Sequence, residues 1–333
     1  MSGEEYWLPI IFVSLMGLAV LVYAILDGYD LGVGILLPLD NEQQRDTMIA
    51  SIGPFWDANE TWLVLAVGLL LIAFPTAHSA VLYHLYIPAV IMLIGLILRG
   101  VAFDFRAKVS VGHKFAWDCA FKAGSLITTL SQGYMLGLYV MGFRTDWEAQ
   151  LFTLLSCLGV TAAYSLIGAA WLILKTEHDL QLRAIRWAKV ALRITAVGIV
   201  AVCIVNPIVN QGVFDQWFTY PRVMFVLLIP ILCITAFVVL YFLLNSLPRQ
   251  GDRYAWLPLM IVASIFVLSF IGLGFSFYPY VVPNELTIWQ AASAPESLRF
   301  ILIGALVVIP TILAYTIFAY RIFRGKATDL KYY

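Results

Sequence analysis

The sequence is poor in charge: Asp, Glu, Lys and Arg make up 12% of its 333 residues, whereas 62% are hydrophobic. Soluble domains carry roughly 25% charged residues, so this composition excludes a soluble globular protein. The 20 basic and 20 acidic residues cancel, and no basic stripe is present that would bind the phosphates of a nucleic acid. The shortage of charge predicts an integral membrane protein.

Cysteine and histidine are also scarce, with four of each. Cys119, Cys157, Cys203 and Cys233 lie singly in apolar segments, without a Cys-x-x-Cys pair or zinc spacing, so we expect small core residues. Haem ligation within a membrane requires His or Met side chains that face the helix bundle at depth. Only His84 could reach such a position, and an interfacial histidine is the simpler interpretation. We therefore expect no metal and no cofactor bound through ligands of this chain.

Long apolar runs dominate what remains. About 20 apolar residues in a helix cross a bilayer core, and lipid excludes open sheet edges, so we expect an all-α polytopic membrane protein. Nine such runs lie near residues 7–30, 52–75, 80–101, 117–142, 151–174, 186–208, 221–245, 254–280 and 299–324. The loops between them are short, which predicts a single integral-membrane domain over residues 1–333.

Charge is distributed unevenly along and across these spans. Residues 7–142 hold most of the intramembrane charge and residues 151–324 are more apolar, which predicts a polar half that carries the chemistry and a scaffold half. If the N-terminus is external, cytoplasmic segments contain fifteen Lys and Arg residues and external segments contain three, Arg144, Arg222 and Arg299. The positive-inside rule therefore predicts an external N-terminus and a cytoplasmic C-terminus.

Six ionisable residues gather near the predicted cytoplasmic ends of the first three spans. They are Asp27, Asp30, Asp57, Glu60, Arg99 and Asp104. Each charge in a bilayer core costs roughly 2.5–3.5 kcal/mol on insertion scales, and Arg99 compensates only one or two of the five acids. Acids that are protonated, hydrated or hydrogen-bonded at this depth are suited to relay protons from the cytoplasm. The alternative interpretation is interfacial, with the same groups capping helices and meeting lipid headgroups.

Two neighbouring patterns have structural interpretations. Asp118 and Lys122 stand at i,i+4 in the fourth predicted span, where they can neutralise one another. Gly28 and Gly32 form a small-xxx-small face that permits close packing of the first helix. The Gly-x-Gly at residues 32–34 follows no strand, which argues against a nucleotide-binding loop.

Longer motifs surround the acids: DGYDLGVG at 27–34, GPFWDANETW at 53–62, RGVAFDFR at 99–106, and FYPYVVP at 277–283 followed by LTIWQAAS at 286–293. In this order they resemble subunit II of the cytochrome bd-type quinol oxidases, including the cyanide-insensitive branch. The resemblance covers essentially the whole chain. Two positions depart from it: Ala58 stands where the family usually has Gly, and Phe55 stands where some members carry His.

The resemblance implies a heterodimer whose subunits share a nine-helix plan of two four-helix bundles plus one peripheral helix. Such a complex oxidises quinol and reduces dioxygen to water in the bacterial cytoplasmic (inner) membrane, and proton uptake from the cytoplasm makes turnover electrogenic. Haems b and d, or b only, are implied in the haem-bearing subunit I, whereas subunit II supplies a proton path. Some members hold a structural quinone in subunit II or add small single-span accessory subunits. Asp57 matches the family's acid in that path, and Asp27, Arg99 and Asp104 match polar positions lining it.

A second interpretation is a stand-alone proton-coupled secondary transporter whose acids bind coupling ions. Against it, the acids lie near one face of the membrane and no inverted repeat with broken helices is visible. A transporter would be stable and active when purified alone, whereas an oxidase subunit would bring a haem-bearing partner with it.

Overall fold

The computed structural model describes residues 3–108 and 113–327, and nearly all of them are helical. Lys331, one of the basic residues that predict a cytoplasmic C-terminus, lies outside this part. The long helices are α1 (Gly3–Leu36), α3 (Trp56–Ala73), α4 (Pro75–Arg106), α5 (Lys114–Val140), α6 (Trp147–Lys175), α7 (His178–Val209), α10 (Leu228–Ser246), α11 (Leu257–Phe277) and α13 (Pro295–Ile322). The short elements are α2 (Glu42–Ile52), α8 (Gln211–Phe218), α9 (Arg222–Val226), α12 (Ile288–Ala291) and the antiparallel strands β1 (Tyr280–Val282) and β2 (Leu286–Thr287).

Eight helices in the described part of the chain are long and apolar enough to cross a membrane. The mostly helical, multi-pass architecture agrees with the expectation, whereas eight candidate spans are found where nine were predicted. The predicted run that is missing from the eight is the fourth, 117–142, which coincides with α5; this helix has 27 residues but carries more polar side chains. Ser125, Thr128 and Thr129 on α5 are fully buried, because they face neighbouring helices and not the surroundings of the protein.

Short elements differ most from the sequence expectation. The segment between the first two predicted spans, expected as a short loop, contains nearly all of α2, which begins where the Asn41 side chain accepts a hydrogen bond from the Gln44 backbone N–H at 3.0 Å. The second predicted span starts later than expected, at Trp56, because a turn at 53–55 separates it from α2. These elements are too short to produce a long apolar run, so hydropathy alone did not reveal them.

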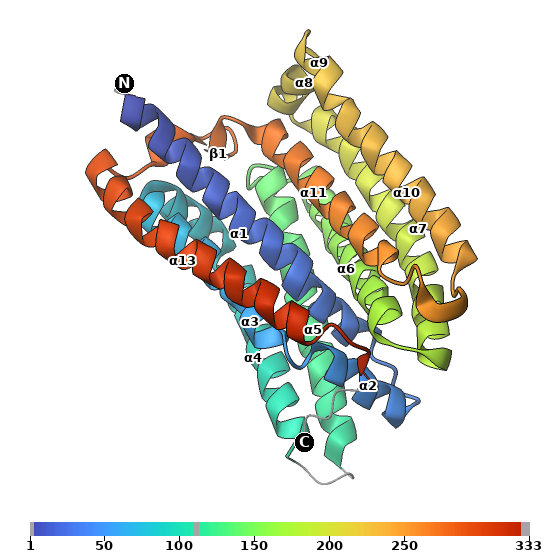
Figure 1. Cartoon of the computed structure of the whole chain (residues 1–333). Coiled ribbons are helices and arrows are strands. Elements are labelled where there is room, and N and C mark those ends of the chain that lie inside the picture. Colours follow the sequence, from blue (N-terminus) through green and yellow to red (C-terminus); the bar gives the residue numbers. More distant parts are fainter. Residues whose placement is uncertain (1–2, 109–112, 328–333) are drawn as a thin grey trace.

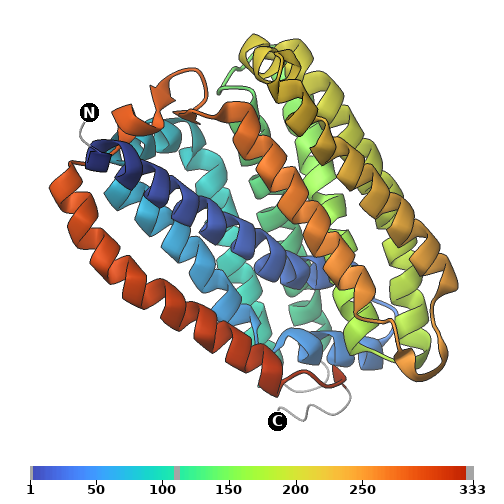
Figure 2. The same ribbon diagram turned by 45° about the horizontal axis from the view of Figure 1, so that its top comes forward.

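The helices form two groups joined at α6. Helices α1, α3, α4 and α5 contact one another on one side, and α6, α7, α10 and α11 do so on the other, with α1 and α5 both packed against α6 (Figure 1). Helix α13 runs along the outside of the first group, where it contacts α1 and α3 (Figure 2). α6 is the most buried of the eight spans, and α13 is the least buried.

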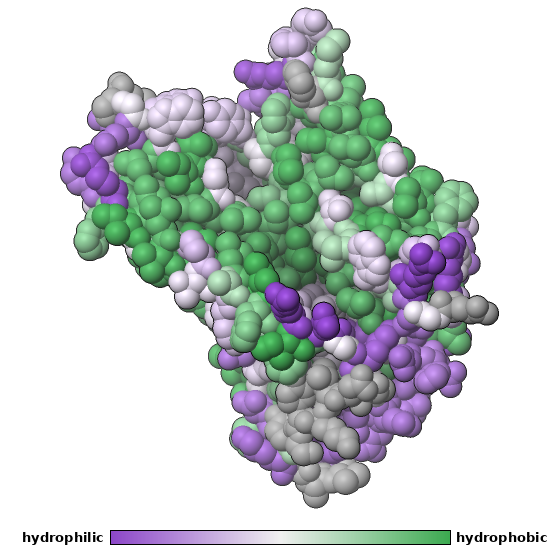
Figure 3. Space-filling view, in the orientation of Figure 1, coloured by the Kyte–Doolittle hydropathy of each residue, from purple (hydrophilic) through white to green (hydrophobic). Residues whose placement is uncertain are grey.

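The two ends of the bundle differ in polarity. The end that contains α2, which we call the α2 end, gathers hydrophilic residues, and the helix sides form a broad hydrophobic face (Figure 3). The opposite end contains α8 and is called the α8 end; α1 begins there and α13 finishes at the α2 end (Figure 1). Assignment of the α2 end to the cytoplasm stays a prediction from the basic residues.

Glycines set the closest approaches between helices. A Cβ added at Gly32 on α1 would lie 1.9 Å from the backbone oxygen of Tyr164 on α6, so the two backbones touch. A Cβ at Gly28 would lie 3.0 Å from the Tyr164 ring, which confirms the predicted small-residue face. α4 and α5 are equally close, because a Cβ at Gly124 would lie 2.7 Å from the backbone oxygen of Gly95. Such contacts are the main source of helix association in lipid.

Candidate functional site

A single buried arginine joins α1, α3 and α4. On α4, Nη2 of Arg99 donates to Oδ1 of Asp27 at 2.6 Å and to Oε1 of Glu60 at 2.7 Å. The side chains of Arg99 and Asp27 are 1% and 0% exposed, whereas that of Glu60 is 26% exposed. Glu60 is thus the member of this trio that reaches the surface.

Close helix packing aims Arg99 into the bundle. A Cβ at Gly124 of α5 would lie 2.8 Å from the backbone nitrogen of Arg99, so no side chain fits between α4 and α5 at this level. The guanidinium points the other way, toward the acids of α1 and α3. Charged hydrogen bonds of this length are among the stronger contacts in proteins.

Asn59 organises the adjoining polar groups. Its Nδ2 donates to Oδ2 of Asp30 at 2.8 Å and to the Tyr29 hydroxyl at 2.9 Å, and its Oδ1 accepts from the Tyr320 hydroxyl at 3.3 Å. The Tyr29 and Tyr320 hydroxyls are 2.5 Å apart. Asp30 lies one turn beyond Asp27 on α1 and is itself 0% exposed. Asn59 therefore connects α1 and α3 to α13.

We call Asp27, Asp30, Asn59, Glu60 and Arg99 the polar cluster. It contains three carboxylates and one guanidinium, so ionisation of all three acids would leave an excess of negative charge that is costly to bury. Among the residues that the structure describes, Oδ2 of Asp27, Oδ1 of Asp30 and Nη1 of Arg99 have no hydrogen-bond partner. Buried polar atoms of this kind are satisfied by ordered water. Three acids around one cation can share protons, and protonation of one acid lowers the excess negative charge.

Aromatic side chains close the polar cluster on the side of α6. Tyr29 stacks on Trp171 with ring centroids 4.1 Å apart, and Phe55 stacks on Tyr320 at 4.5 Å. Nζ of Lys175 lies 5.1 Å from the centre of the Trp171 ring and 5.5 Å from that of Phe55. Phe55, the position where some relatives carry histidine, is fully buried. The wall of the site is apolar at this point, so a histidine-assisted step there is unavailable.

A second hydrogen-bonded chain lies deeper in the bundle. Nε2 of Gln132 donates to the Tyr23 hydroxyl, and the Tyr164 hydroxyl donates to Oε1 of Gln132, both at 2.7 Å. Tyr23 precedes Asp27 by one helical turn on α1, so this chain connects the level of the polar cluster to α5 and α6. No role was expected for Gln132 from the sequence; an amide in the middle of an apolar run was the available signal.

Two of the six predicted site residues lie outside the polar cluster. Asp57, in the first turn of α3, and Asp104, near the end of α4, are both exposed. Asp57 stands three residues before Glu60, so both lie on one face of α3. The structure thus gathers Asp27, Asp30, Glu60 and Arg99 and leaves Asp57 and Asp104 on the surface near the α2 end.

The predicted ion pair between Asp118 and Lys122 is wrong. The Asp118 carboxylate is fully buried and accepts hydrogen bonds from Nε of Arg45 at 2.6 Å and from Nε of Arg106 at 2.5 Å. Nζ of Lys122 instead donates to the backbone oxygen of Leu37 at 2.8 Å. Tertiary packing brings guanidinium groups from α2 and α4 to Asp118, and two such donors bind a carboxylate more strongly than one ammonium in the next turn.

The remaining candidates for cofactor binding lie at surfaces. In the part of the chain that the structure describes, no group of three or more His, Cys, Asp and Glu residues could hold a metal ion. His84 is exposed and stacks on Phe143 at 4.5 Å. All four cysteines are free; Cys157 and Cys233 are buried, as predicted for small core residues, whereas Cys119 and Cys203 are half-buried.

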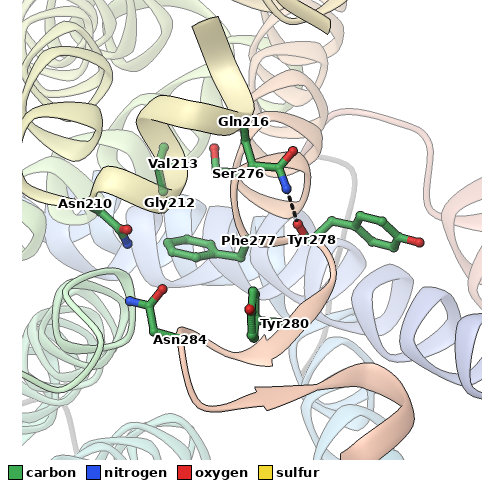
Figure 4. A pocket seen from close by; sticks show the side chains of 9 residues that line it. All are labelled: Asn210, Gly212, Val213, Gln216, Ser276, Phe277, Tyr278, Tyr280 and Asn284. Atoms are coloured by element: carbon green, nitrogen blue, oxygen red, sulfur yellow. Dashed lines mark hydrogen bonds between the residues drawn. The ribbon is translucent and has the colours of Figure 1, made fainter. Parts of the chain in front are cut away.

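A small cavity lies at the α8 end, between α8, the end of α11 and the β1–β2 hairpin (Figure 4). Asn210 and Asn284 face one another across it, and Nε2 of Gln216 donates to the backbone oxygen of Tyr278 at 2.9 Å (Figure 4). Its volume is about 40 Å³. Ligand pockets measure about 300–1,000 Å³, so this space suits a few water molecules.

Comparisons with known proteins agree with one another. Residues 8–323 match the family model described as cytochrome bd terminal oxidase subunit II. The chain is 30% identical to the cytochrome bd-I ubiquinol oxidase subunit 2 of Escherichia coli (strain K12), over 94% of this chain and 93% of that protein. It is 28% identical to the cytochrome bd ubiquinol oxidase subunit 2 of Bacillus subtilis (strain 168), over 98% and 97%.

A solved structure shares the fold. The bd oxidase from Geobacillus thermodenitrificans contains a chain that superposes with a TM-score of 0.78 at 18% identity, over 95% of this chain and 98% of that one. The family match covers almost the whole sequence, including every member of the polar cluster. This chain belongs to the cytochrome bd terminal oxidase subunit II family.

Proposed function

We propose that the chain supplies a proton path from the cytoplasm to the haem-bearing subunit of a bd-type quinol oxidase, and that it stabilises that complex. The reaction of the complex would be quinol oxidation coupled to reduction of dioxygen to water. The observation that carries the proposal is the contact of Arg99 with Asp27 and Glu60: a buried cation holds two acids from different helices, and one acid remains accessible.

The proposed path begins at the exposed acids of the α2 end. Asp57 and Asp104 would collect protons, and Glu60 would pass them to Asp27 beside Arg99. The exposure of the two outer acids at the α2 end supports their role as the entry of the path, because an acid that collects protons has to meet water. The haem-bearing subunit would receive the protons beyond Asp27, at the inner end of the path. Residues 7–142 would carry this chemistry, with residues 151–324 mainly as scaffold.

The haems of the complex, b and d or b only, would lie in the partner subunit. Among the histidines of this chain, His84, His113 and His178 are exposed and His78 is half-buried, whereas haem ligands inside a membrane face the bundle interior. The proposed location is the bacterial cytoplasmic membrane with the α2 end inside. Proton uptake from that side alone would make turnover electrogenic.

Glu60→Gln and Asp57→Asn test the path in the purified complex. Both changes remove an acid and keep the side-chain shape, so we expect assembly with normal haem content. Oxygen consumption with reduced quinol should fall roughly tenfold or more in each variant, equivalent to about 1.4 kcal/mol or more in the barrier to turnover. Glu148→Gln, an exposed acid at the α8 end, is the matched control and should leave the rate unchanged. Normal turnover in Glu60→Gln would remove this residue from the path.

A further inference from the structure

A much larger cavity lies toward the α8 end of α4, away from the polar cluster. Its volume is about 860 Å³, within the range of about 300–1,000 Å³ that binds small molecules. Three helices, α4, α5 and α6, supply its walls. Residues that define them are His84, Ile91, Leu130, Leu138, Leu154 and Leu158.

Helix geometry gives the length of this cavity. On α4 its lining runs from His84 to Ile91, and on α5 from Leu130 to Leu138. At 1.5 Å per residue both stretches are about 11–12 Å long, which is about a third of the hydrocarbon thickness of a bilayer. Agreement between the two helices indicates a groove parallel to their axes, and therefore roughly parallel to lipid chains.

The groove is more polar at one end. At the α8 end its lining includes His84, Thr145 and Gln150, whereas toward mid-membrane it combines Leu130 and Leu158 with Ser131 and Tyr134. Its rim on α6 faces outward, since Leu154 and Leu158 are 59% and 63% exposed. The groove is therefore open sideways to the bilayer, and its more polar end lies at the level of the α5–α6 loop.

We propose that this groove binds one acyl chain of a zwitterionic phospholipid such as phosphatidylethanolamine. The chain would occupy the apolar length, and the ester groups would accept hydrogen bonds from Thr145 and Gln150. Charges of both signs lie beside the mouth: Arg144 pairs with Asp146 at 2.7 Å and approaches Glu148 at 3.9 Å. This rim matches a headgroup with one phosphate and one ammonium.

Other occupants fit the groove less well. Anionic lipids are recognised by clusters of 4–8 Lys or Arg residues, and Arg144 is the basic residue of the α5–α6 loop, where its charge is already paired with Asp146. A tightly held isoprenoid quinone would need an enclosed pocket for its ring, whereas this groove is bounded by exposed leucines along α6.

Native mass spectrometry of the purified oxidase complex, with quantification of extracted lipid, tests the proposal. Leu158→Trp fills the groove, and Leu151→Trp is a matched control, because Leu151 lies two turns away on α6, is 61% exposed and is not part of the lining. We expect one phosphatidylethanolamine per complex in the native protein and the control. In Leu158→Trp we expect at least tenfold weaker retention, equivalent to about 1.4 kcal/mol.

Two further variants distinguish weaker lipid binding from misfolding of the Leu158→Trp protein. Gln150→Leu changes no backbone contact and should also weaken retention, whereas Leu158→Ala widens the groove and should keep the lipid. Delipidated complex should gain thermal stability when phosphatidylethanolamine is added, except in Leu158→Trp. Equal retention in both tryptophan variants, or recovery of quinone in place of phospholipid, would overturn the assignment. Turnover does not enter these readouts, so they are independent of the proton-path experiment.

Discussion

Replacing Arg99 by methionine should be the most damaging single change in the polar cluster. Methionine keeps much of the apolar volume and removes the charge. The Asp27 and Glu60 carboxylates would then lose their shared cation while Asp27 remains fully buried. Breaking a buried ion pair by removing one partner costs about 3–5 kcal/mol, because an uncompensated charge is left behind.

The same reasoning predicts a rescue. Adding Asp27→Asn to Arg99→Met removes the charge that the first substitution stranded, so the double variant should be more stable than Arg99→Met alone. Residues in direct contact show coupling energies of about 0.5–3 kcal/mol. The expected recovery lies within that range and leaves the double variant below the native protein, since the hydrogen bond at 2.6 Å is lost.

The stability of each variant can be measured by denaturing the purified complex in mixed micelles of mild detergent and dodecyl sulfate, with tryptophan fluorescence and haem absorption as readouts. We expect the highest denaturation midpoint for the native protein, a lower one for the double variant and the lowest for Arg99→Met. Glu148→Gln, placed at the α8 end, should superimpose on the native curve. A double variant that is equal to or worse than Arg99→Met would show that Asp27 and Arg99 do not compensate one another, and the account of the cluster would be refuted.

Two further substitutions probe packing and a surface ion pair. Gly32→Leu should prevent assembly of the complex, because a Cβ there would lie 1.9 Å from the Tyr164 backbone oxygen, whereas Gly68→Leu, with nothing within 4 Å of its Cβ, should assemble normally on a membrane-extraction gel. Arg183 bonds Asp40 at 3.0 Å and lowers the pKa of that carboxyl, so its stabilising effect is present above the ordinary carboxyl pKa and is lost as pH falls through the lowered value. Melting temperatures of native and Asp40→Asn complexes should therefore differ slightly at neutral pH and converge in acid; a constant difference would contradict the pairing.

Hydropathy was informative about the long helices for a simple reason. In lipid, a spanning backbone has to form its own hydrogen bonds, so an apolar run of about 20 residues is expected to be a helix. α5 shows where this reasoning weakens: it carries buried serine and threonine residues that lower its hydropathy. Hydropathy did not predict α2 and the β1–β2 hairpin, because short elements depend on caps and turns and not on the number of apolar residues.

Local spacing was a poor guide to ion pairs. Asp118 and Lys122 satisfy the i,i+4 rule, yet Asp118 binds Arg45 and Arg106, which are distant in sequence and adjacent in space. Pairing depends on which donors reach a buried carboxylate, and in a helical bundle neighbouring helices supply them as readily as the next turn. The sequence contained all four residues without indicating this choice.

For this protein, the sequence alone determined an α-helical membrane chain, the identity of the acids near one face, and its family motifs, because composition and motifs are properties of the residues themselves. Tertiary structure decided which of those acids share Arg99, that Asp57 and Asp104 stay outside, and that Asn59 and Gln132 extend the hydrogen-bonded network. The physical reason is that burial and hydrogen bonding depend on how α1, α3, α4 and α5 approach one another. Glycine contacts such as that of Gly124 with α4 determine how closely these helices pack, and the sequence of one helix does not show which helix packs against it.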